Sequence, residues 1–373
     1  MKIVAAGTLN PAEAGERRSC SLYPTVTPIG NGTLLATYTV GSTKDSEDNT
    51  IELRWSSDNG GTWSAPRAPF ETTIDGRKGS LLAGYITPLS FTHLLIVAAW
   101  VDRQAHPGKP LFNAETEGIL PMKAVLADSH DCGQTWRRWR VLPLPAELGP
   151  AAVTGPIIRL SEGKLVLSLE NGKSYEDVSR WYQKVWFCYS GDQGRTWTTP
   201  AIGCEDPSGR IFNWDQKAGL APDGRLVTFT WTYDREVRRY LNIHRRISPD
   251  GGRTWTDPED LGIADQPAHP AVLSDGRVVL AWVDRFKSRT IRARFSESID
   301  APFLPETEVT LYEHHKNQEI AETYQATGEL LAELSSWDFG HPHAEALPNG
   351  DVIVVFYAGT NPLLNAQWVR LRL

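Results

Sequence analysis

Acidic residues next to apolar runs are the first candidates for chemistry in this sequence. Asp48 lies in an acidic loop after the run that ends at Tyr38, and Asp215 lies in the stretch Asn213-Trp214-Asp215-Gln216, which opens another run. Two carboxyl groups can cleave a glycosidic bond when one donates a proton and the other attacks the sugar or activates water. We therefore predict that Asp48 and Asp215 form a catalytic pair.

Histidine and tyrosine side chains at similar positions could move protons instead. His341 lies in the stretch Gly340-His341-Pro342-His343, and Tyr233 and Tyr357 each follow an apolar run. An imidazole or a phenol can remove the proton next to a carboxylate, which starts β-elimination in a lyase. We predict His341 and Tyr233 as catalytic groups, with Tyr357 as the alternative tyrosine. The histidines lack a spacing typical of metal ligands, so we expect neither a metal nor another cofactor.

Three arginines could bind an acidic substrate. Arg103, Arg235 and Arg285 each follow an aspartate directly after an apolar run. A guanidinium group binds a carboxylate or a sulfate through two parallel hydrogen bonds, so we predict that these residues hold the substrate. The other interpretation is that each Asp-Arg pair orders its own loop as a surface ion pair. The predicted binding set is completed by Glu170, His269 and His343.

A turn motif recurs along the chain and indicates how these residues are positioned. The pattern S-x-D-x-G-x-T-W occurs four times, starting at Ser56, Ser129, Ser190 and Ser248. Its serine and aspartate side chains can bond backbone N–H groups, and its glycine can adopt a positive φ. Each copy holds one acidic residue, whereas calcium needs about six to eight oxygen ligands. The motif therefore predicts a structural turn with its tryptophan packed beneath.

Two-residue turns between apolar runs form a second repeat. An Asn-Gly or Asp-Gly pair between such runs is a strong signal of a β-hairpin. One copy, at 84–103, has Ser90-Phe91-Thr92-His93 at its turn. The five other copies have the turns Asn31-Gly32, Glu162-Gly163, Asp223-Gly224, Asp275-Gly276 and Asn349-Gly350. Six repeats predict an all-β, six-bladed β-propeller that forms a single domain over residues 1–373.

The repeat order predicts where in such a propeller a site would lie. Residues 2–6 should pair with 367–373 and so close the ring. Both kinds of turn fall at one end of the blades, whereas the loops after each second strand and the entries into each innermost strand fall at the other. All the candidate residues belong to this second end, so we predict a pocket there. Trp100, Trp214 and Trp282 lie nearby and could stack on sugar rings.

The motif copies, the six-fold period and the order of strands resemble the sialidase (neuraminidase) superfamily, also called Asp-box or BNR-repeat proteins. The resemblance covers essentially the whole chain. It implies a tyrosine nucleophile assisted by a glutamate, an aspartate acid/base and three arginines that clamp the substrate carboxylate. By position, Asp45 or Asp48 matches the acid/base. Asp215 matches the glutamate, His341 stands in place of the tyrosine, and Leu22 stands where the first arginine is expected.

The composition limits the classes of partner. The net charge is −7, which argues against nucleic acid because a phosphate backbone favours a dense basic face. No apolar stretch suits a transmembrane helix and no secretory signal is recognisable, so we expect no membrane partner and a cytoplasmic location. The four cysteines lie far apart, which predicts free thiols. The sequence does not indicate an oligomeric state.

These observations predict a glycoside hydrolase of the sialidase superfamily that is exo-acting on an acidic glycan. Two alternatives remain open. A polysaccharide lyase acting on a uronate-containing glycan would use the histidine and tyrosine groups. A non-catalytic carbohydrate-binding propeller would use the tryptophans.

Overall fold

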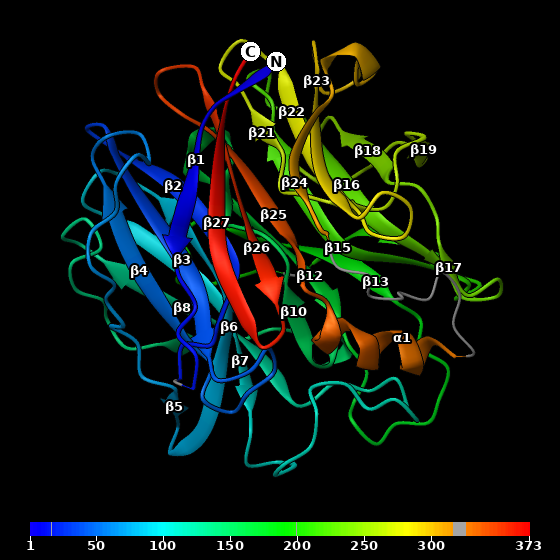
Figure 1. Ribbon diagram of the computed structural model, residues 1–373. Helices are drawn as coiled ribbons and strands as arrows, with labels where there is room; N and C mark the ends of the chain where they lie inside the picture. The colour runs from blue at the N-terminus through cyan, green and yellow to red at the C-terminus, as the bar shows by residue number, and fades with distance from the viewer. Residues whose placement is uncertain (16, 199, 316–325) are drawn as a thin grey trace.

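The protein is built almost entirely of β-strands (Figure 1). The computed structural model describes residues 1–15, 17–198, 200–315 and 326–373. Its strands form five hydrogen-bonded sheets, of which four have five strands and one has seven. The helical segments are short and comprise α1 (Thr327–Glu333), η1 (Ala146–Leu148), η2 (Ser161–Gly163), η3 (Pro305–Thr307) and η4 (Leu334–Ser336).

The strands fall into six groups in chain order. The first group is β2 (Cys20–Gly30), β3 (Thr33–Gly41) and β4 (Thr50–Ser56). The second is β5 (Thr73–Ile74), β6 (Arg77–Pro88), β7 (Leu94–Asp102), β8 (Met122–Ser129) and β9 (Arg140–Val141). The third is β10 (Ala151–Val153), β11 (Ile158–Arg159), β12 (Leu165–Asn171), β13 (Lys184–Ser190) and β14 (Ala201–Glu205).

The later groups have the same layout. The fourth is β15 (Ile211–Leu220), β16 (Leu226–Asp234), β17 (Arg239–Tyr240), β18 (His244–Ser248) and β19 (Glu259–Asp260). The fifth is β20 (Gln266–Pro267), β21 (Ala271–Val272), β22 (Val278–Asp284), β23 (Thr290–Ser296) and β24 (Val309–Glu313). The last is β25 (Phe339–Ala346), β26 (Val352–Thr360) and β27 (Leu363–Arg372), joined by β1 (Lys2–Asn10).

The groups follow one another around a ring. The innermost strand β2 contacts β6 of the next group and β25 of the last, and β15 contacts β12 before it and β20 after it. Because β25 also contacts β20 and β21, the ring closes into a β-propeller. The core lies between neighbouring sheets, where Val279 of β22 and Val354 of β26 belong to one apolar cluster. The seven-stranded sheet holds the first and last groups, which share one parallel pair, Cys20 with Leu364; we interpret them as separate blades.

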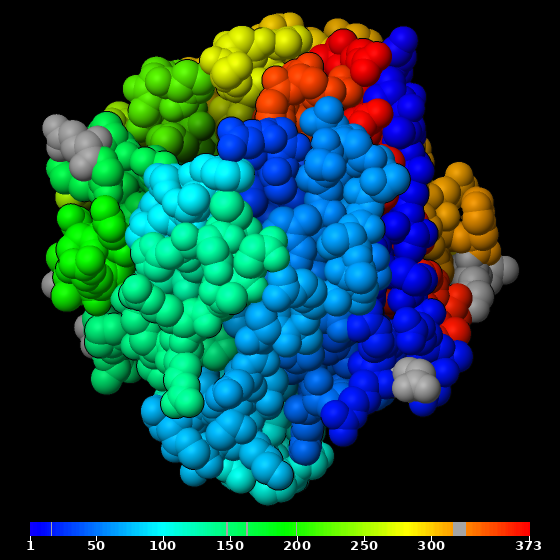
Figure 2. All heavy atoms as spheres, turned by 90° about the vertical axis from the view of Figure 1, so that its left-hand side faces the viewer, coloured from blue at the N-terminus to red at the C-terminus, as the bar shows by residue number. Residues whose placement is uncertain are grey.

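The two ends of the chain pair with each other. β1 runs antiparallel to β27, and Ile3 pairs with Leu371. Figure 1 shows both termini close together, and Figure 2 shows the dark-blue N-terminal strand beside red C-terminal residues. The predicted pairing of residues 2–6 with 367–373 is therefore confirmed. It makes β1 the outer strand of the last blade.

The predicted turns are formed by local hydrogen bonds. Asn31 and Gly32 have φ values of 49° and 71°, as a two-residue hairpin of type I′ requires. In the first S-x-D-x-G-x-T-W copy, Thr62 donates its N–H to Asp58 at 2.9 Å, and Gly60 donates its N–H to Ser56 Oγ at 2.9 Å. The other three copies repeat these bonds. The motif is therefore a structural turn.

The structure also bears on the expected free thiols and on the expected lack of a membrane-spanning helix. Cys20, Cys188 and Cys204 are buried, Cys132 is partly exposed, and all four are free thiols, as predicted. Among the described residues, no helix combines the length and apolarity that crossing a membrane requires.

Candidate functional site

Four innermost strands carry a β-bulge at the same place, and each bulge gives a non-glycine residue a positive φ. These residues are Tyr23 in β2 (48°), Ala83 in β6 (50°), Asp215 in β15 (47°) and His341 in β25 (45°). The pairing register shifts at each of them. A bulge re-aims a side chain, and all four residues line one pocket. The bulges therefore build this pocket from four blades.

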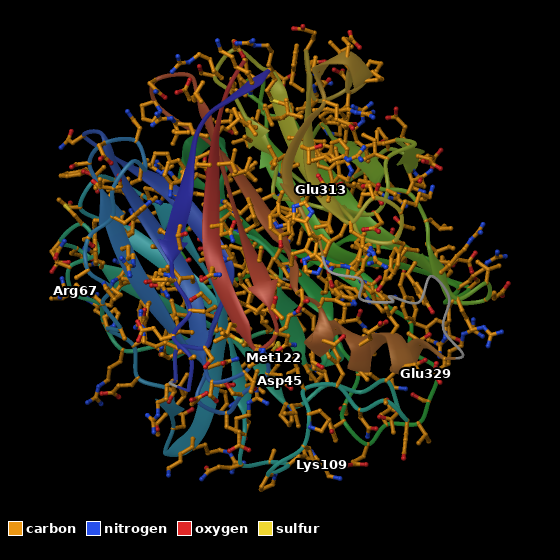
Figure 3. The ribbon with its side chains drawn as sticks, viewed as in Figure 1. Asp45, Arg67, Lys109, Met122, Glu313 and Glu329 are labelled. Carbon is orange, nitrogen blue, oxygen red and sulfur yellow. The ribbon has the colours of Figure 1, made fainter. Side chains whose placement is uncertain are left out.

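The pocket has a volume of about 470 Å³ and lies at the end of the ring that the sequence predicts. Lys44 and Asp45, which follow β3, line it, as do residues of the segment 110–114. Leu331 of α1 and Trp337 after η4 also line it. Figure 3 labels Asp45 near its lower centre, close to α1. The loops and the helix therefore enclose the bulged residues.

Asp215 lines the pocket and has two close neighbours, of which His341 also lines it and Lys217 lies buried behind it. Lys217 donates from Nζ to Oδ1 at 2.6 Å, and His341 Nδ1 lies 3.5 Å from Oδ2. Lys217 also donates to the carbonyl of Thr154 at 2.8 Å. Burial opposes the charged form of Lys217, but the charge of Asp215 raises the pKa of Lys217 above its usual value. The carboxylate of Asp215 is therefore balanced by a buried ammonium group.

Glu170 lies beside Asp215, and its environment favours the protonated form of its carboxyl group. Its residue is 8% exposed, and its Oε1 accepts the backbone N–H of Gln216 at 2.8 Å. Burial, together with the charge of Asp215, raises the pKa of Glu170 to about 8. Glu170 is therefore protonated at neutral pH and can donate a proton.

Tyr23 and His341 form an edge-to-face pair next to Asp215. Their ring centres are 4.6 Å apart and their planes are inclined by 74°. Burial lowers the pKa of His341 to about 3, and burial raises the pKa of Tyr23 above its usual value. At neutral pH the imidazole is therefore uncharged and the phenol keeps its proton.

Comparison with known proteins places this architecture in a family. A family model described as a BNR repeat-like domain matches residues 5–261. The chain belongs to the BNR repeat-like domain family. No curated protein sequence gives a significant match.

Solved structures share the whole fold of this BNR repeat-like domain. A protein of unknown function from Dyadobacter fermentans is 20% identical, with a TM-score of 0.72 and 100% of both chains covered. An intramolecular trans-sialidase from Ruminococcus gnavus is 13% identical, with a TM-score of 0.64, covering 100% of this chain and 98% of that one. A sialidase from Trypanosoma rangeli is 13% identical, with a TM-score of 0.64, covering 99% of this chain and 60% of that one. The chain therefore shares its fold with solved sialidases and trans-sialidases.

Two of the predicted arginines are paired with carboxylates of the domain and do not line the pocket. Arg103 is 5% exposed and donates from Nη2 to Asp45 at 2.7 Å. Arg235 donates from Nη2 to both carboxylate oxygens of Glu117 at 2.7 Å. These ion pairs order the loops around the pocket. This agrees with the second interpretation of the arginines, in which they order loops and do not bind substrate.

Arg285 is also absent from the pocket lining. It is 1% exposed, and its guanidinium carbon lies 3.9 Å from the ring centre of Trp337. Its Nη2 donates to Gln266 Oε1 at 3.1 Å. Trp337 itself lines the pocket, so Arg285 supports one wall of the site from a buried position and does not reach the cavity.

The acidic loop after β3 contributes Asp45 to the pocket, whereas the predicted Asp48 does not line it. Asp48 accepts hydrogen bonds from the backbone N–H and the hydroxyl of Ser42, each at 3.1 Å. Burial would raise the pKa of Asp48, but these hydrogen bonds and one from Ser46 lower it. Asp48 therefore caps its own loop and is a poor proton donor.

The two predicted tyrosines are also placed outside the lining. Tyr233 is fully buried, and its ring stacks on Trp214 at 5.2 Å between centres. Tyr357 is fully buried and accepts a hydrogen bond from Lys44 Nζ at 2.7 Å. Trp214 and Lys44 both line the pocket, so each tyrosine packs behind a lining residue. Trp100 and Trp282 are buried as well and are not part of the lining.

Of the remaining predicted binding residues, Glu170 lines the pocket, and the two histidines do not. His269 and His343 stack on each other with ring centres 4.4 Å apart. His269 Nδ1 lies 3.3 Å from the carbonyl of Ala344. Burial lowers the pKa of each histidine to about 3. The pair therefore packs two neighbouring blades together in uncharged form.

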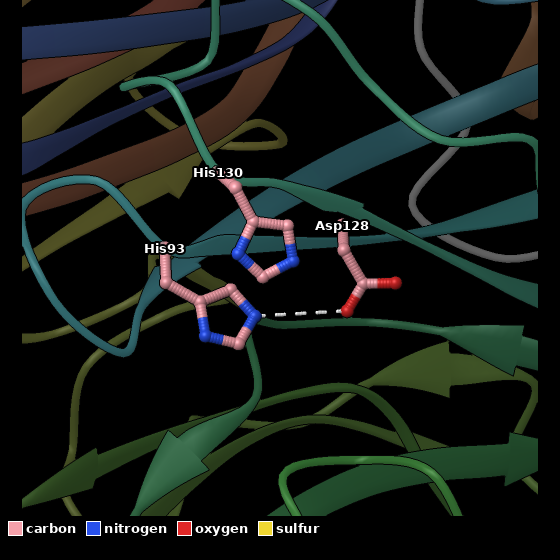
Figure 4. Close-up of side chains that lie close together, drawn as sticks. All are labelled: His93, Asp128 and His130. Atoms are coloured by element: carbon pink, nitrogen blue, oxygen red, sulfur yellow. Dashed lines mark ion pairs between the residues drawn. The ribbon is translucent and has the colours of Figure 1, made fainter.

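Two groups among the described residues hold several metal-binding atoms close together. They are His93, Asp128 and His130 (Figure 4), and His269, His343 and Glu345; within each group these atoms lie within 4.8 Å of one another. In both groups the imidazole rings are stacked, with planes 24° and 14° apart. The nitrogen lone pairs of an imidazole lie in the plane of its ring, so two stacked, nearly parallel rings do not aim their lone pairs at one point. The ligands of a single metal ion point at a common centre, and this stacking therefore does not suit a metal site. Neither group lines the pocket.

Two lining residues, Tyr23 and Lys44, were not singled out by the sequence. The sequence does hold a signal for Tyr23: a proline follows it directly, as Pro342 follows the predicted His341, which suggests an equivalent position in its strand. Lys44 had none, since its partners lie far along the chain. It donates to the carbonyls of Leu334 and Trp337 and to the hydroxyl of Tyr357.

Proposed function

We propose that this chain is an exo-acting glycoside hydrolase of the sialidase superfamily, with Glu170 and Asp215 as its catalytic carboxyl pair. The observation that carries the proposal is the contrast between these two groups inside one pocket. A pKa of about 8 keeps Glu170 protonated at neutral pH, whereas Asp215 is paired with the ammonium group of Lys217. Carboxyl groups whose environments differ in this way serve glycosidases as acid and as base or nucleophile.

The proposed reaction assigns one step to each group. Glu170 donates its proton to the glycosidic oxygen as the bond to the anomeric carbon breaks. Asp215 then either attacks the anomeric carbon or takes a proton from the water that attacks it. Tyr23, which keeps its proton, donates a hydrogen bond to the sugar, and the neutral His341 holds the phenol in place.

The exo-acting form of the proposal is supported by the shape of the site. The volume of about 470 Å³ falls within the range of about 300–1,000 Å³ that is typical of small-ligand sites. Leu331 of α1, Trp337 and residues 110–114 surround it. Such an enclosure suits the end of a glycan better than its middle.

Other parts of the sequence-based expectation have less support. An acidic substrate would find one lysine and no arginine in the described lining, and burial lowers the pKa of that lysine, Lys44, well below its usual value. A lyase acting on a uronate would use the Tyr23–His341 contact for proton transfer. A non-catalytic sugar-binding role would rest on the tryptophans of the lining. A panel of substrates tests the acidic substrate and the lyase by the product formed, and a sugar that binds without being cleaved would fit the non-catalytic role.

The test of the proposal is hydrolysis of a broad panel of α- and β-glycosides, including sialosides and uronides, by the purified protein. Proton NMR of the first product identifies hydrolysis, its stereochemistry and any unsaturated product of elimination. Glu170→Gln and Asp215→Asn should each reduce kcat at least about 100-fold. Asp275→Asn, in an exposed turn between β21 and β22, is the matched control. The proposal fails if no glycoside is cleaved or if both pocket variants retain the wild-type rate.

A further inference from the structure

We infer that the pocket accepts an uncharged sugar residue and excludes sugars that carry a carboxylate. The inference rests on the proposed function for the carbohydrate class of the ligand. It departs from what the sialidase resemblance implies, because a carboxylate clamp requires arginines at the ligand. It is carried by the charges that line the pocket and by the partners that those charges already have.

The described lining contains no arginine and an excess of carboxyl groups. Its ionisable members are Lys44, Asp45, Glu170, Asp215 and His341, together with Tyr23 and Tyr85. Asp45 and Asp215 are already balanced by Arg103 and Lys217, so the lining offers a ligand carboxylate no unpaired positive charge, and burying an unpaired carboxylate is costly. Burial lowers the pKa of His341 to about 3, so its imidazole supplies no compensating charge.

The two ammonium groups near the pocket are already engaged. Lys44 Nζ donates to the carbonyls of Leu334 and Trp337 at 2.7 and 3.1 Å and to the Tyr357 hydroxyl at 2.7 Å. These three acceptors use every N–H bond that a protonated Lys44 has, and burial lowers the pKa of Lys44 well below its usual value, so its charge is itself disfavoured. Lys217 Nζ is held by Asp215 at 2.6 Å and by a backbone carbonyl at 2.8 Å. Neither group can turn to a ligand carboxylate without leaving a buried acceptor unpaired.

The arginines cannot replace them without breaking buried contacts. Arg103 is 5% exposed and holds Asp45 at 2.7 Å. Arg285 is 1% exposed beneath Trp337. Arg235 is committed to Glu117, on both of its carboxylate oxygens. A ligand carboxylate would therefore enter the pocket with no cation to receive it.

The same lining suits an uncharged sugar. Trp181, Trp214, Trp231 and Trp337 lie on its walls, with Phe112, Leu82 and Met122. Aromatic rings pack on the C–H faces of a pyranose, and carboxylates accept hydrogen bonds from hydroxyl groups. Asp45 and Asp215 keep further lone pairs beside their ion pairs, so they are suitable acceptors for the hydroxyl groups of a neutral polyol.

Matched pairs of sugars that differ only at carbon 6 test the inference. Methyl glucoside is compared with methyl glucuronide, and methyl galactoside with methyl galacturonide, in both anomeric forms; N-acetylneuraminic acid serves as a further acid. Binding is measured by ligand-observed NMR with the full chain. The uncharged member of at least one pair should bind at least about tenfold more tightly than its acidic partner. Equal or tighter binding of the acid, or binding of neither member of any pair, overturns the inference.

Variants locate the binding and test charge as its cause. Ala332→Trp narrows the pocket from α1 and should abolish binding, whereas Ala68→Trp, on an exposed loop away from the lining, should not. Ala83→Arg supplies a guanidinium group at a bulge and should shift the affinity ratio at least about tenfold towards the acid, with Ala83→Met as the control for size. No shift in a folded Ala83→Arg protein contradicts charge exclusion. Because binding is read without turnover, an uncharged sugar that binds and is never cleaved overturns only the hydrolase proposal.

Discussion

The backbone N–H of Gln216 donates to Oε1 of Glu170 over 2.8 Å, directly after the bulged residue Asp215. This bond joins β15 of one blade to β12 of the blade before it. A single backbone segment therefore positions both carboxyl groups of the pocket, and it does so across a blade boundary.

The rate of the wild-type protein should fall as the pH rises through the pKa of Glu170, which is about 8. The reason is that Glu170 must be protonated to donate a proton to the leaving group. The measurement is kcat/KM from about pH 5 to 10 on any glycoside that the panel identifies. If the residual activity of Glu170→Gln still falls as the pH rises through about 8, the fall in kcat/KM belongs to another group, and the role of Glu170 as the proton donor is contradicted.

Glu170→Gln should change the pH dependence of stability. The pKa of Glu170 is raised from 4.5 to about 8 in the folded protein, so folding takes up a proton between these values. The wild type therefore loses stability as the pH rises through this window, by an amount on the order of a few kcal/mol from this group. The variant should lack that loss, and its unfolding free energy relative to wild type should increase from pH 5 to 8. A constant difference would contradict the raised pKa.

Asp215→Asn should destabilise the protein by about 3–5 kcal/mol, because it leaves the buried ammonium group of Lys217 without its counter-charge. Lys217→Met should also be destabilising, since it leaves Asp215 unpaired. The double variant removes both charges and should recover most of the lost stability while remaining inactive. Urea unfolding and the glycoside panel give the two readouts. Additive losses in the double variant would show that the pair is not energetically coupled.

His341→Gln and Tyr23→Phe should each lower kcat by about 10- to 100-fold with a smaller effect on KM, since both groups act on the geometry of the reacting sugar. His130→Gln, at an exposed position, is the matched control. The pKa of His341 is lowered to about 3, so the wild-type rate should show no ionisation of this group from about pH 5 to 7. A histidine-dependent acid limb in that range would contradict the buried, neutral imidazole.

Asp192→Ala should lower stability without lowering kcat. Asp192 accepts the N–H of Thr196 at 2.9 Å, the Thr196 hydroxyl at 2.6 Å and the Ser190 hydroxyl at 2.8 Å. Losing these bonds should cost about 1–3 kcal/mol, measured by urea unfolding. Asp257→Ala, in an exposed loop, should cost much less. A calcium chelator should leave the melting temperature of the wild type unchanged; a chelator-dependent loss would contradict the structural reading of this turn.

Features set by neighbouring residues could be predicted from the sequence. The hairpins and the S-x-D-x-G-x-T-W turns form within a few residues, so their patterns determine their structure. Asp215 and His341 were located because each precedes a recognisable turn by a repeated distance, and the bulges keep that distance. These local regularities account for the architecture and for three residues of the pocket, since Glu170 was also located by its place at the end of an apolar run.

Features set by distant partners could not be predicted. Arg103 and Arg235 resemble ligand-binding residues in sequence, yet their partners Asp45 and Glu117 lie 58 and 118 positions away. The ring of Tyr233 stacks on Trp214 and is buried behind it, a packing contact that no local sequence pattern reveals. The same holds for Lys44, whose acceptors lie around 300 positions along the chain.

The four bulged residues line the pocket without taking part in the strand pairing that holds the sheets in register. Tyr23, Ala83, Asp215 and His341 interrupt the pairing of their strands, so their side chains are not needed to maintain the register of the sheets. Exchanging side chains at such positions can give one scaffold different substrates over evolutionary time. Three of these positions, Tyr23, Ala83 and His341, are accordingly the natural set to randomise when selecting a propeller of this kind for a new sugar, because Asp215 also balances the charge of Lys217.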